Sequence, residues 1–296
     1  MNGLATVARV LPPSRAKVRS GRLIAIIVAG LGLDPRTITT LPDGSRMQLD
    51  PRGRTEAIAF WNGAYEPDYV KVLCDLASTQ ADPVVYDIGA NIGLVTVPVA
   101  MAVRRRSGRV VSFEPVRENH ERLIENVGLN DLAETCSVYP LGLAATEGHA
   151  TMEREAAFGA TTGNAFLDAG GQHGHGLVTM IVELARLDDV VRCADLPLPT
   201  ILKLDVEGAE VGVLAGAQET LDRARPIILG EFNSGLMPRF GHTFLDAVAL
   251  LPHGYSIFSF ASRDTIVEKP PSVGLGDVLL VPQEKCSLLP LRQLPR

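Results

Sequence analysis

The stretch Val84-Val-Tyr-Asp-Ile-Gly-Ala-Asn-Ile-Gly93 joins a short apolar run to a glycine-rich turn. Its first five residues are mostly apolar, as in a strand that is buried on both faces of a sheet. Gly89 and Gly93 permit a tight turn and a close approach of a ligand to the backbone. The residues from about 93 to 105 then predict a helix. This order of strand, glycine turn and helix is typical of the first unit of an α/β fold.

Strands and helices continue to alternate through the rest of the chain. Further strands are predicted at residues 109–113, 137–141, 200–204, 226–230, 255–260 and 277–281, and helices at 68–79, 115–129, 209–224 and 243–251. Alternation at this spacing produces βαβ units, which build a mainly parallel sheet with helices on both faces. The last two strands have no long helix between them, so we expect an antiparallel pair at the sheet edge. Residues 148–182 are expected to be irregular, with an extra hairpin and a loop, and Pro42-Asp-Gly44 predicts a hairpin turn.

The composition excludes several classes of protein. Of 296 residues, 46% are hydrophobic and 21% are charged, which is ordinary for a folded domain and excludes a disordered or coiled-coil chain. The net charge of −6 argues against a nucleic-acid partner, and the 5% of aromatic residues argues against a surface that stacks single-stranded bases. The four cysteines are widely spaced, with no C-x-x-C pair, so we expect no disulfide or zinc site and a cytoplasmic location.

The first 33 residues differ from the rest of the chain. They contain five basic residues and no acid, and their longest apolar run, Leu23 to Leu33, is too short for a bilayer span of roughly 20 residues. A basic stretch before a short apolar run is also typical of a signal peptide, but the small-residue cleavage pattern is poor. We expect a helix that packs on the domain or lies on the inner face of the membrane. The alternative is a solvated, partly ordered tail.

Acidic side chains stand at the ends of four predicted strands. They are Asp87, Glu114, Asp205 and Glu231. The carboxyl ends of parallel strands meet at one edge of the sheet, where such a group of charges is unfavourable without ligands or cations. Glu114 stands where an acid accepts both hydroxyls of a ribose. These residues therefore predict a binding site for a nucleoside-bearing ligand at this edge.

A further carboxylate, Glu207, follows Asp205 in the stretch Lys203-Leu-Asp-Val-Glu-Gly-Ala-Glu210. In strand alternation Asp205 and Glu207 share one face, where either could accept a proton from an attacking hydroxyl. Together they could instead hold a divalent cation, or one of them could cap the helix that follows. His173 and His175 are spaced like metal ligands, but a surface loop is the favoured interpretation, and we assign no metal site.

Signatures of other nucleotide-binding proteins and of hydrolases are missing from the sequence. The spacing Gly89-x-x-x-Gly93 is not the dinucleotide fingerprint G-x-G-x-x-G, and no Walker lysine follows the turn. No G-x-S-x-G elbow occurs, so a serine hydrolase has no support. An NAD(P)-dependent oxidoreductase is accordingly disfavoured.

Four stretches, in this order, resemble motifs of the FkbM family of S-adenosylmethionine-dependent methyltransferases. They are Tyr86-Asp-Ile-Gly-Ala-Asn-Ile-Gly93, Gly108-Arg-Val-Val-Ser-Phe-Glu-Pro115, Lys203-Leu-Asp-Val-Glu-Gly-Ala-Glu210 with Leu214-x-Gly216, and Pro226-Ile-Ile-Leu-Gly-Glu231. The resemblance extends from about residue 40 to 235 and includes Leu187-Asp-Asp189. It implies a class I methyltransferase fold, which is a mostly parallel, Rossmann-like sheet of seven strands with helices on both faces and an antiparallel last strand.

The resemblance also implies roles for individual residues. It places the methionine end of S-adenosylmethionine at the first glycine turn, the ribose at the end of the second strand and the adenosine near the helix that follows. The segment Gly63-Ala-Tyr-Glu66 is similar to a family stretch that covers the cofactor. The implied cofactor-binding residues are Asp87, Gly89, Asn91, Gly93, Glu114, Asn119 and Glu66.

By the same resemblance, we expect transfer of a methyl group to a hydroxyl of a sugar, a glycolipid or a polyketide-type metabolite. Asp205 or Glu207 would be the base or would orient the acceptor, with Glu231 assisting. The acceptor would be a small molecule or a lipid-linked one. The alternative is a non-catalytic, S-adenosylmethionine-binding or membrane-associated scaffold.

The expected organisation has four parts. An N-terminal appendage precedes a hairpin and helix that cover the cofactor, and the methyltransferase domain precedes a short tail. The expected bounds are 1–35, 36–82, 83–285 and 286–296. The Gly- and His-rich segment 159–176 matches no family pattern.

Overall fold

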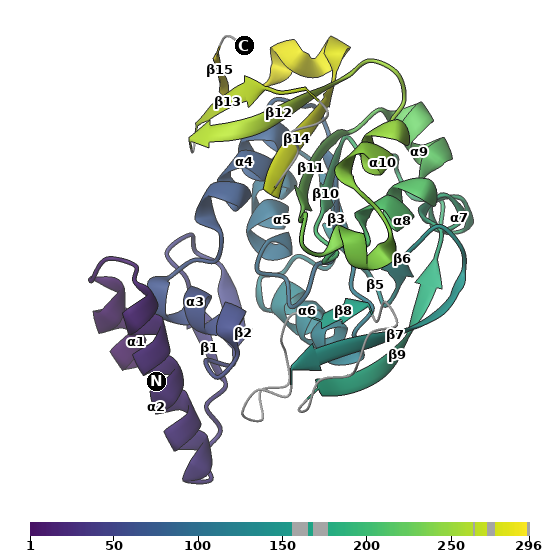
Figure 1. Ribbon diagram of the computed structural model, residues 1–296. Helices are drawn as coiled ribbons and strands as arrows, with labels where there is room; N and C mark the ends of the chain where they lie inside the picture. The colour runs from purple at the N-terminus through teal and green to yellow at the C-terminus, as the bar shows by residue number, and fades with distance from the viewer. Residues whose placement is uncertain (156–164, 168–176, 263, 271–275, 295–296) are drawn as a thin grey trace.

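A nine-stranded mixed sheet forms the centre of the part of the chain that the computed structural model describes, residues 1–155, 165–167, 177–262, 264–270 and 276–294 (Figure 1). Five parallel strands make up one half of it, in the order β11-β10-β3-β4-β5. They are β3 (Val84–Ile88), β4 (Arg109–Phe113), β5 (Cys136–Tyr139), β10 (Ile201–Leu204) and β11 (Ile227–Phe232). Their carboxyl ends share one edge, as the sequence predicted.

The late strands build the other half of the sheet. β14 (Gly276–Pro282) pairs antiparallel with β11 on one side and with β12 (Tyr255–Ser262) on the other. The expected antiparallel pairing of the two late strands is confirmed, but their expected place at the sheet edge is wrong, because two further strands extend the sheet beyond β12. The seven strands from β5 to β12 confirm the class I methyltransferase sheet with one antiparallel member. β13 (Thr265–Glu268) and β15 (Arg292–Leu294) extend it.

Helices cover both faces of the sheet because side chains alternate along each strand. Val85 and Ile201 face a core shared with α4 (Pro67–Ser78), α5 (Thr96–Arg104) and α6 (Arg117–Leu129). Their neighbours Tyr86 and Leu202 face a second core, shared with α7 (Leu187–Cys193), α8 (Glu210–Ala215), α9 (Gln218–Ala224) and α10 (Phe244–Ala249). The described residues also include the short 3-10 helices η1 (Met237–Phe240) and η3 (Gln283–Leu288).

The prediction of one helix over residues 209–224 was wrong, because α8 and α9 are separate helices. Gly216 lies between them, and a Cβ built there would lie 2.0 Å from the carbonyl oxygen of Ala144. This position therefore accommodates a backbone contact that a side chain would block. The side chain of Asp188 binds backbone and side-chain donors in the first turn of α9. Its Oδ1 accepts hydrogen bonds from the backbone N–H and the hydroxyl of Thr220, both at 2.8 Å, which satisfies a donor that the helix start leaves open.

Residues 148–182 are more regular than the sequence indicated. β7 (Gly148–Glu155) and β9 (Leu177–Ala185) pair antiparallel, so an extra hairpin is present. β6 (Gly142–Leu143) and β8 (Ala165–Leu167) join them in a separate four-stranded sheet. His173 and His175, with most of the segment 159–176, lie outside the described residues.

The N-terminal residues form two helices that pack on a third. α1 (Asn2–Arg9) and α2 (Arg15–Gly30) lie on α3 (Arg54–Asn62), so the alternative of a solvated tail was wrong. The predicted hairpin is confirmed as β1 (Thr37–Thr40) and β2 (Arg46–Leu49). Within the described residues, every helix is too short or too polar to cross a membrane.

Candidate active site

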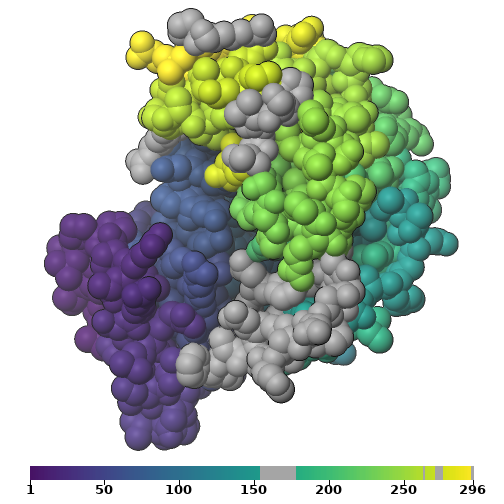
Figure 2. All heavy atoms as spheres, in the orientation of Figure 1, coloured from purple at the N-terminus to yellow at the C-terminus, as the bar shows by residue number. Residues whose placement is uncertain are grey.

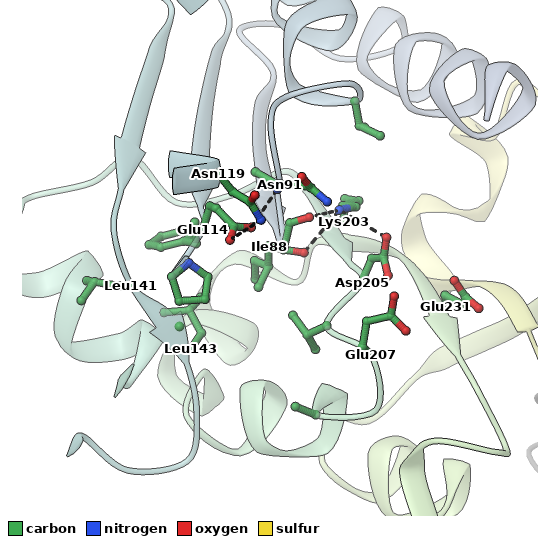
Figure 3. A pocket seen from close by; sticks show the side chains of 18 of the residues that line it. Ile88, Asn91, Glu114, Asn119, Leu141, Leu143, Lys203, Asp205, Glu207 and Glu231 are labelled. Atoms are coloured by element: carbon green, nitrogen blue, oxygen red, sulfur yellow. Dashed lines mark hydrogen bonds and ion pairs between the residues drawn. The ribbon is translucent and has the colours of Figure 1, made fainter. Parts of the chain in front are cut away.

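A pocket opens at the carboxyl ends of β3, β4, β10 and β11 (Figure 3). The empty space there, counted together with the open solvent at its mouth, is about 1080 Å³. The pocket is lined by seven residues that the sequence predicted for the site, Gly89, Asn91, Glu114, Asn119, Asp205, Glu207 and Glu231. The other three, Asp87, Gly93 and Glu66, are not part of its lining.

The first glycine turn fits tightly against the end of β10. Gly89 has a φ of +81°, and a Cβ built there would lie 1.9 Å from the carbonyl oxygen of Asp205. The backbone N–H groups of Gly89 and Ala90 both donate to the carbonyl of Phe113, at 3.0 Å. Both the backbone conformation and the space at Gly89 exclude a side chain. The turn is thereby held with its residues along the pocket wall.

Three donors fix the carboxylate of Glu114. One oxygen accepts from the backbone N–H of Asn91 and the other from the backbone N–H of Val116, both at 2.9 Å. Nδ2 of Asn119 donates to the second oxygen at 3.3 Å. Burial raises the pKa of Glu114 to about 7, although these hydrogen bonds lower it in part. A carboxylate has about four lone-pair sites, so Glu114 keeps acceptor capacity for a ligand.

Asn119 offers a second acceptor at the same end of the pocket. Its side chain is buried, and its Oδ1 has no hydrogen-bond partner among the described residues. A buried polar atom without a partner is unfavourable unless a ligand or a water supplies one. Oδ1 of Asn119 is therefore available to a ligand donor such as an amino group, beside the carboxylate of Glu114 (Figure 3).

Asp87 lies beneath the pocket. Its buried carboxylate pairs with Nζ of Lys203 at 2.9 Å and accepts a hydrogen bond from the hydroxyl of Thr96. The pair forms because Lys203 stands opposite Asp87 in the parallel register of β10 and β3. The expectation that Asp87 places a carboxylate in the pocket was therefore wrong. Gly93 also has a packing role, because a Cβ there would lie 2.6 Å from Cδ1 of Leu123.

Three carboxylates, those of Asp205, Glu207 and Glu231, lie side by side at the other end of the pocket (Figure 3). Glu207 does not reach it by strand alternation, because β10 ends before Asp205 and Glu207 has a φ of +54° in the following turn. The helix-capping alternative was wrong as well. The residue that precedes α8 is Ala209, and no side chain caps this helix.

The environment of Glu231 changes its acidity. Burial, together with the charges of Asp205 and Asp277, raises the pKa of Glu231 to about 7. Asp277 belongs to β14 and stands directly opposite Glu231 in the antiparallel register. A carboxyl group with a pKa near 7 is present in both forms at neutral pH, as a general base requires. Across the described part of the chain, no three His, Cys, Asp or Glu side chains are arranged to hold a metal ion.

The sequence patterns did not identify several residues of the pocket. Tyr65 lines it, whereas its neighbour Glu66 only approaches it and has its pKa raised, first by burial and also by the charge of Asp205. An apolar wall comes from the end of β4 and from the small sheet, with the residues Phe113, Leu141, Leu143, Met152 and Leu184. These side chains belong to apolar stretches without a distinctive motif, so the sequence does not mark them as pocket residues. Only the position of the four-stranded sheet shows that they line the pocket. Tyr65 did carry a signal, since it lies within Gly63-Ala-Tyr-Glu66.

The chain is similar in sequence to proteins that are named as methyltransferases. Residues 87–257 of the chain match the methyltransferase FkbM domain. The chain is 28% identical to hexuronic acid methyltransferase AglP of Haloferax volcanii over 176 residues, which are 59% of this chain and 65% of AglP. It is also 28% identical to methyltransferase sdnD of Sordaria araneosa over an alignment of 193 residues, and the match covers 56% of this chain and 73% of sdnD. The chain thus spans a little under two thirds of AglP.

A solved structure with a related arrangement is the methyltransferase FkbM from Methylobacillus flagellatus. The similarity covers 68% of this chain and 43% of that chain, with a TM-score of 0.42 and 17% identity. The family assignment rests instead on the domain match, which covers more than half of the 296 residues. The chain belongs to the FkbM family of methyltransferases.

Proposed function

We propose that this protein is an S-adenosylmethionine-dependent O-methyltransferase that acts on a hydroxyl of a sugar, a glycolipid or a polyketide-type metabolite. The observation that carries the proposal is one pocket with two chemically different ends. Glu114 and Asn119 offer acceptors at one end, and the carboxylates of Asp205, Glu207 and Glu231 lie at the other. A sugar-type acceptor is supported by the similarity to AglP, which is a hexuronic acid methyltransferase. The acceptor is either free or lipid-linked.

The first end of the pocket fits the nucleoside part of the cofactor. The carboxylate of Glu114 would accept the ribose hydroxyls, and the unpartnered Oδ1 of Asn119 would accept from the adenine amino group. The apolar wall that includes Leu143 and Met152 would flank the adenine ring. The side-chain-free turn at Gly89 would let the methionine part approach the backbone. When bound, S-adenosylmethionine supplies an electrophilic methyl group on a sulfonium.

The second end of the pocket would orient the acceptor and take up its proton. A hydroxyl becomes a good nucleophile when a positioned base accepts its proton. We assign the role of proton acceptor to the carboxylate of Glu231, whose pKa is raised to about 7. We assign the orientation of the acceptor to Asp205 and Glu207. This assignment differs from the hypothesis drawn from the sequence, which gave the base to Asp205 or Glu207. Alignment of the hydroxyl with the methyl group would supply most of the acceleration.

Calorimetric titration of the full chain tests the cofactor. S-adenosylmethionine and S-adenosylhomocysteine are the ligands, and NADH is the negative control. Glu114→Ala should weaken binding at least about tenfold, because it removes the ribose acceptor and leaves the N–H groups of Asn91 and Val116 unpaired. Glu125→Ala is the matched control, because Glu125 is exposed on α6 and lies outside this pocket.

The same experiment defines what would contradict the proposal. A folded chain that binds neither ligand, or a Glu114→Ala variant that binds as tightly as the parent, would overturn the cofactor assignment. With binding established, transfer of a labelled methyl group to hydroxylated sugars and glycolipids, followed by mass spectrometry of the products, tests the acceptor class.

A further inference from the structure

The outer face of α2 carries an unusual row of side chains. Arg15, Arg19, Leu23, Ile27 and Leu31 follow one another at intervals of four residues, so they form one ridge along the helix and its end. All five are exposed, and the three apolar members keep 58%, 54% and 72% of their surface in solvent. The ridge is therefore basic in its first half and apolar in its second half. We call it the α2 ridge.

The packing of α2 explains why the ridge stays exposed. The opposite side of the helix, with Val18, Gly21 and Ala25, is buried. A Cβ built on Gly21 would lie 2.2 Å from the ring of Trp61, so α2 lies in close contact with α3 along this side. The ridge points away from that contact. The first helices project from the body of the protein, as the purple spheres in Figure 2 show.

We call residues 1–33 the arm. Only some of its basic side chains make hydrogen bonds within the protein. Arg9 donates to the carbonyl oxygens of Phe60 and Thr40. Lys17 donates to the carbonyl oxygens of Ala8 in α1 and of Leu11 in the α1–α2 connection. Arg15 and Arg19 make no ion pair with a carboxylate of the described residues. The arm contains no acid at all, since Asp34 is the first acidic residue of the chain. Two exposed guanidinium groups therefore stand uncompensated next to an apolar surface.

We propose that the α2 ridge docks on an anionic lipid bilayer. Leu23, Ile27 and Leu31 would enter the interface between headgroups and acyl chains, and Arg15 and Arg19 would contact lipid phosphates. A second copy of the chain fits the surface less well. A symmetric contact would set the basic half of each ridge either against the other basic half or against the apolar half of the second copy, without an acid on either arm to compensate the guanidinium groups. An anionic bilayer offers acyl chains to the apolar half of the ridge and phosphates to the basic half.

Vesicle flotation of the full chain tests the proposal. The vesicles contain phosphatidylcholine alone or phosphatidylcholine with phosphatidylglycerol, and the parent chain should bind only the anionic ones strongly. Arg15→Gln with Arg19→Gln should weaken this binding by about fivefold for each guanidinium removed, with a smaller dependence on salt. Ile27→Asp with Leu31→Asp should weaken it by at least about tenfold, because the apolar contact is lost.

The matched control is Leu245→Asp on α10, because Leu245 is also 54% exposed but lies outside the arm. It should leave vesicle binding unchanged. Circular dichroism of each variant checks that the fold is intact. Absence of binding by the parent chain, or equal binding by all variants, would overturn the proposal. A dimer in light scattering that the Ile27→Asp, Leu31→Asp variant dissolves, without vesicle binding by the parent, would assign the ridge to a second copy instead.

Discussion

Nζ of Lys203 lies 2.9 Å from Oδ1 of Asp87, and both side chains are almost completely buried, with Lys203 at the floor of the pocket and Asp87 beneath it. The same ammonium group donates to the carbonyl oxygen of Gly89 at 2.8 Å. Burial lowers the pKa of Lys203, but the charges of Asp87 and Asp205 more than offset this effect and raise it overall. Lys203 therefore ties β3, β10 and the first glycine turn together at the floor of the site.

Replacement of this lysine should destabilise the fold strongly. Lys203→Met leaves the carboxylate of Asp87 buried without its cation, which should lower the free energy of unfolding by about 3–5 kcal/mol. Lys203→Met combined with Asp87→Asn should recover part of the loss, because no buried charge remains. Urea unfolding measures both. Lys71→Met, at an exposed residue that pairs with Asp75, should change stability by less than about 1 kcal/mol. A loss in Lys203→Met no larger than in Lys71→Met would contradict a structural role for the pair.

The two glycines Gly89 and Gly128 should respond in opposite ways to alanine. At Gly89 the new Cβ would meet the carbonyl oxygen of Asp205 at 1.9 Å in a backbone with φ of +81°. Gly89→Ala should therefore cost about 2–5 kcal/mol of stability and remove cofactor binding. At Gly128, in the last turns of α6, nothing lies within 4 Å of the new Cβ. Gly128→Ala should be neutral or stabilise by up to about 1 kcal/mol. Thermal unfolding and calorimetry of both variants check this contrast.

The strands were predictable because each is an apolar run with a carboxylate at or next to its carboxyl end. β3 and β4 have the predicted bounds for this reason. The sequence could not tell on which side of the sheet edge each acid lies. Asp87 and Asp205 both follow apolar residues, yet Asp87 is buried under the pocket and Asp205 lines it. The register that sets Lys203 opposite Asp87 decides the difference, and register is a property of two strands far apart in the chain.

Helix α3 shows another limit of the sequence patterns. Its inner face includes Glu56, an acid that interrupts the apolar pattern expected of a packed helix. In the fold, Glu56 is buried and forms an ion pair with Arg122 of α6 at 2.6 Å. The partner lies 66 residues further along the chain, so local periodicity cannot reveal it. The same reasoning applies to Tyr65, which lies between α3 and α4 and lines the pocket beside residues far along the chain.

Asp205 should affect turnover more than cofactor binding. Its side chain lines the end of the pocket that we assign to the acceptor, away from Glu114 and Asn119 (Figure 3). Asp205→Asn should lower kcat by about 10-fold to 100-fold, because the acceptor loses an orienting carboxylate, while the Kd for S-adenosylmethionine changes little. Asp222→Asn, at an exposed position of α9, should change neither quantity. Equal losses in kcat and cofactor affinity would show that Asp205 acts on the cofactor instead.

Glu231 should make both activity and stability depend on pH near neutrality. If its carboxylate accepts the proton of the acceptor, kcat should rise as the pH passes through about 7, and Glu231→Gln should lower kcat by about 10²-fold or more and abolish that rise. For stability, the pKa of Glu231 is about 7 in the folded protein and about 4.5 in the unfolded chain. The folded state therefore keeps a proton that the unfolded chain releases, so the contribution of Glu231 to stability is lost as the pH rises from about 4.5 to 7.

Glu231→Gln should accordingly reduce the fall in Tm between pH 5 and pH 8, a window set by the raised pKa of Glu231. Glu284→Gln is the contrasting control, because its hydrogen bond with Arg225 lowers the pKa of Glu284 to about 2. That group is ionised in the folded and unfolded states throughout this window, and its stabilising effect is lost only at more acidic pH. Its replacement should shift Tm by a similar amount at pH 5 and at pH 8. If the Glu231→Gln variant kept the full fall in Tm between pH 5 and pH 8, the titrating group would have to be another carboxylate, and the raised pKa that supports Glu231 as proton acceptor would be contradicted.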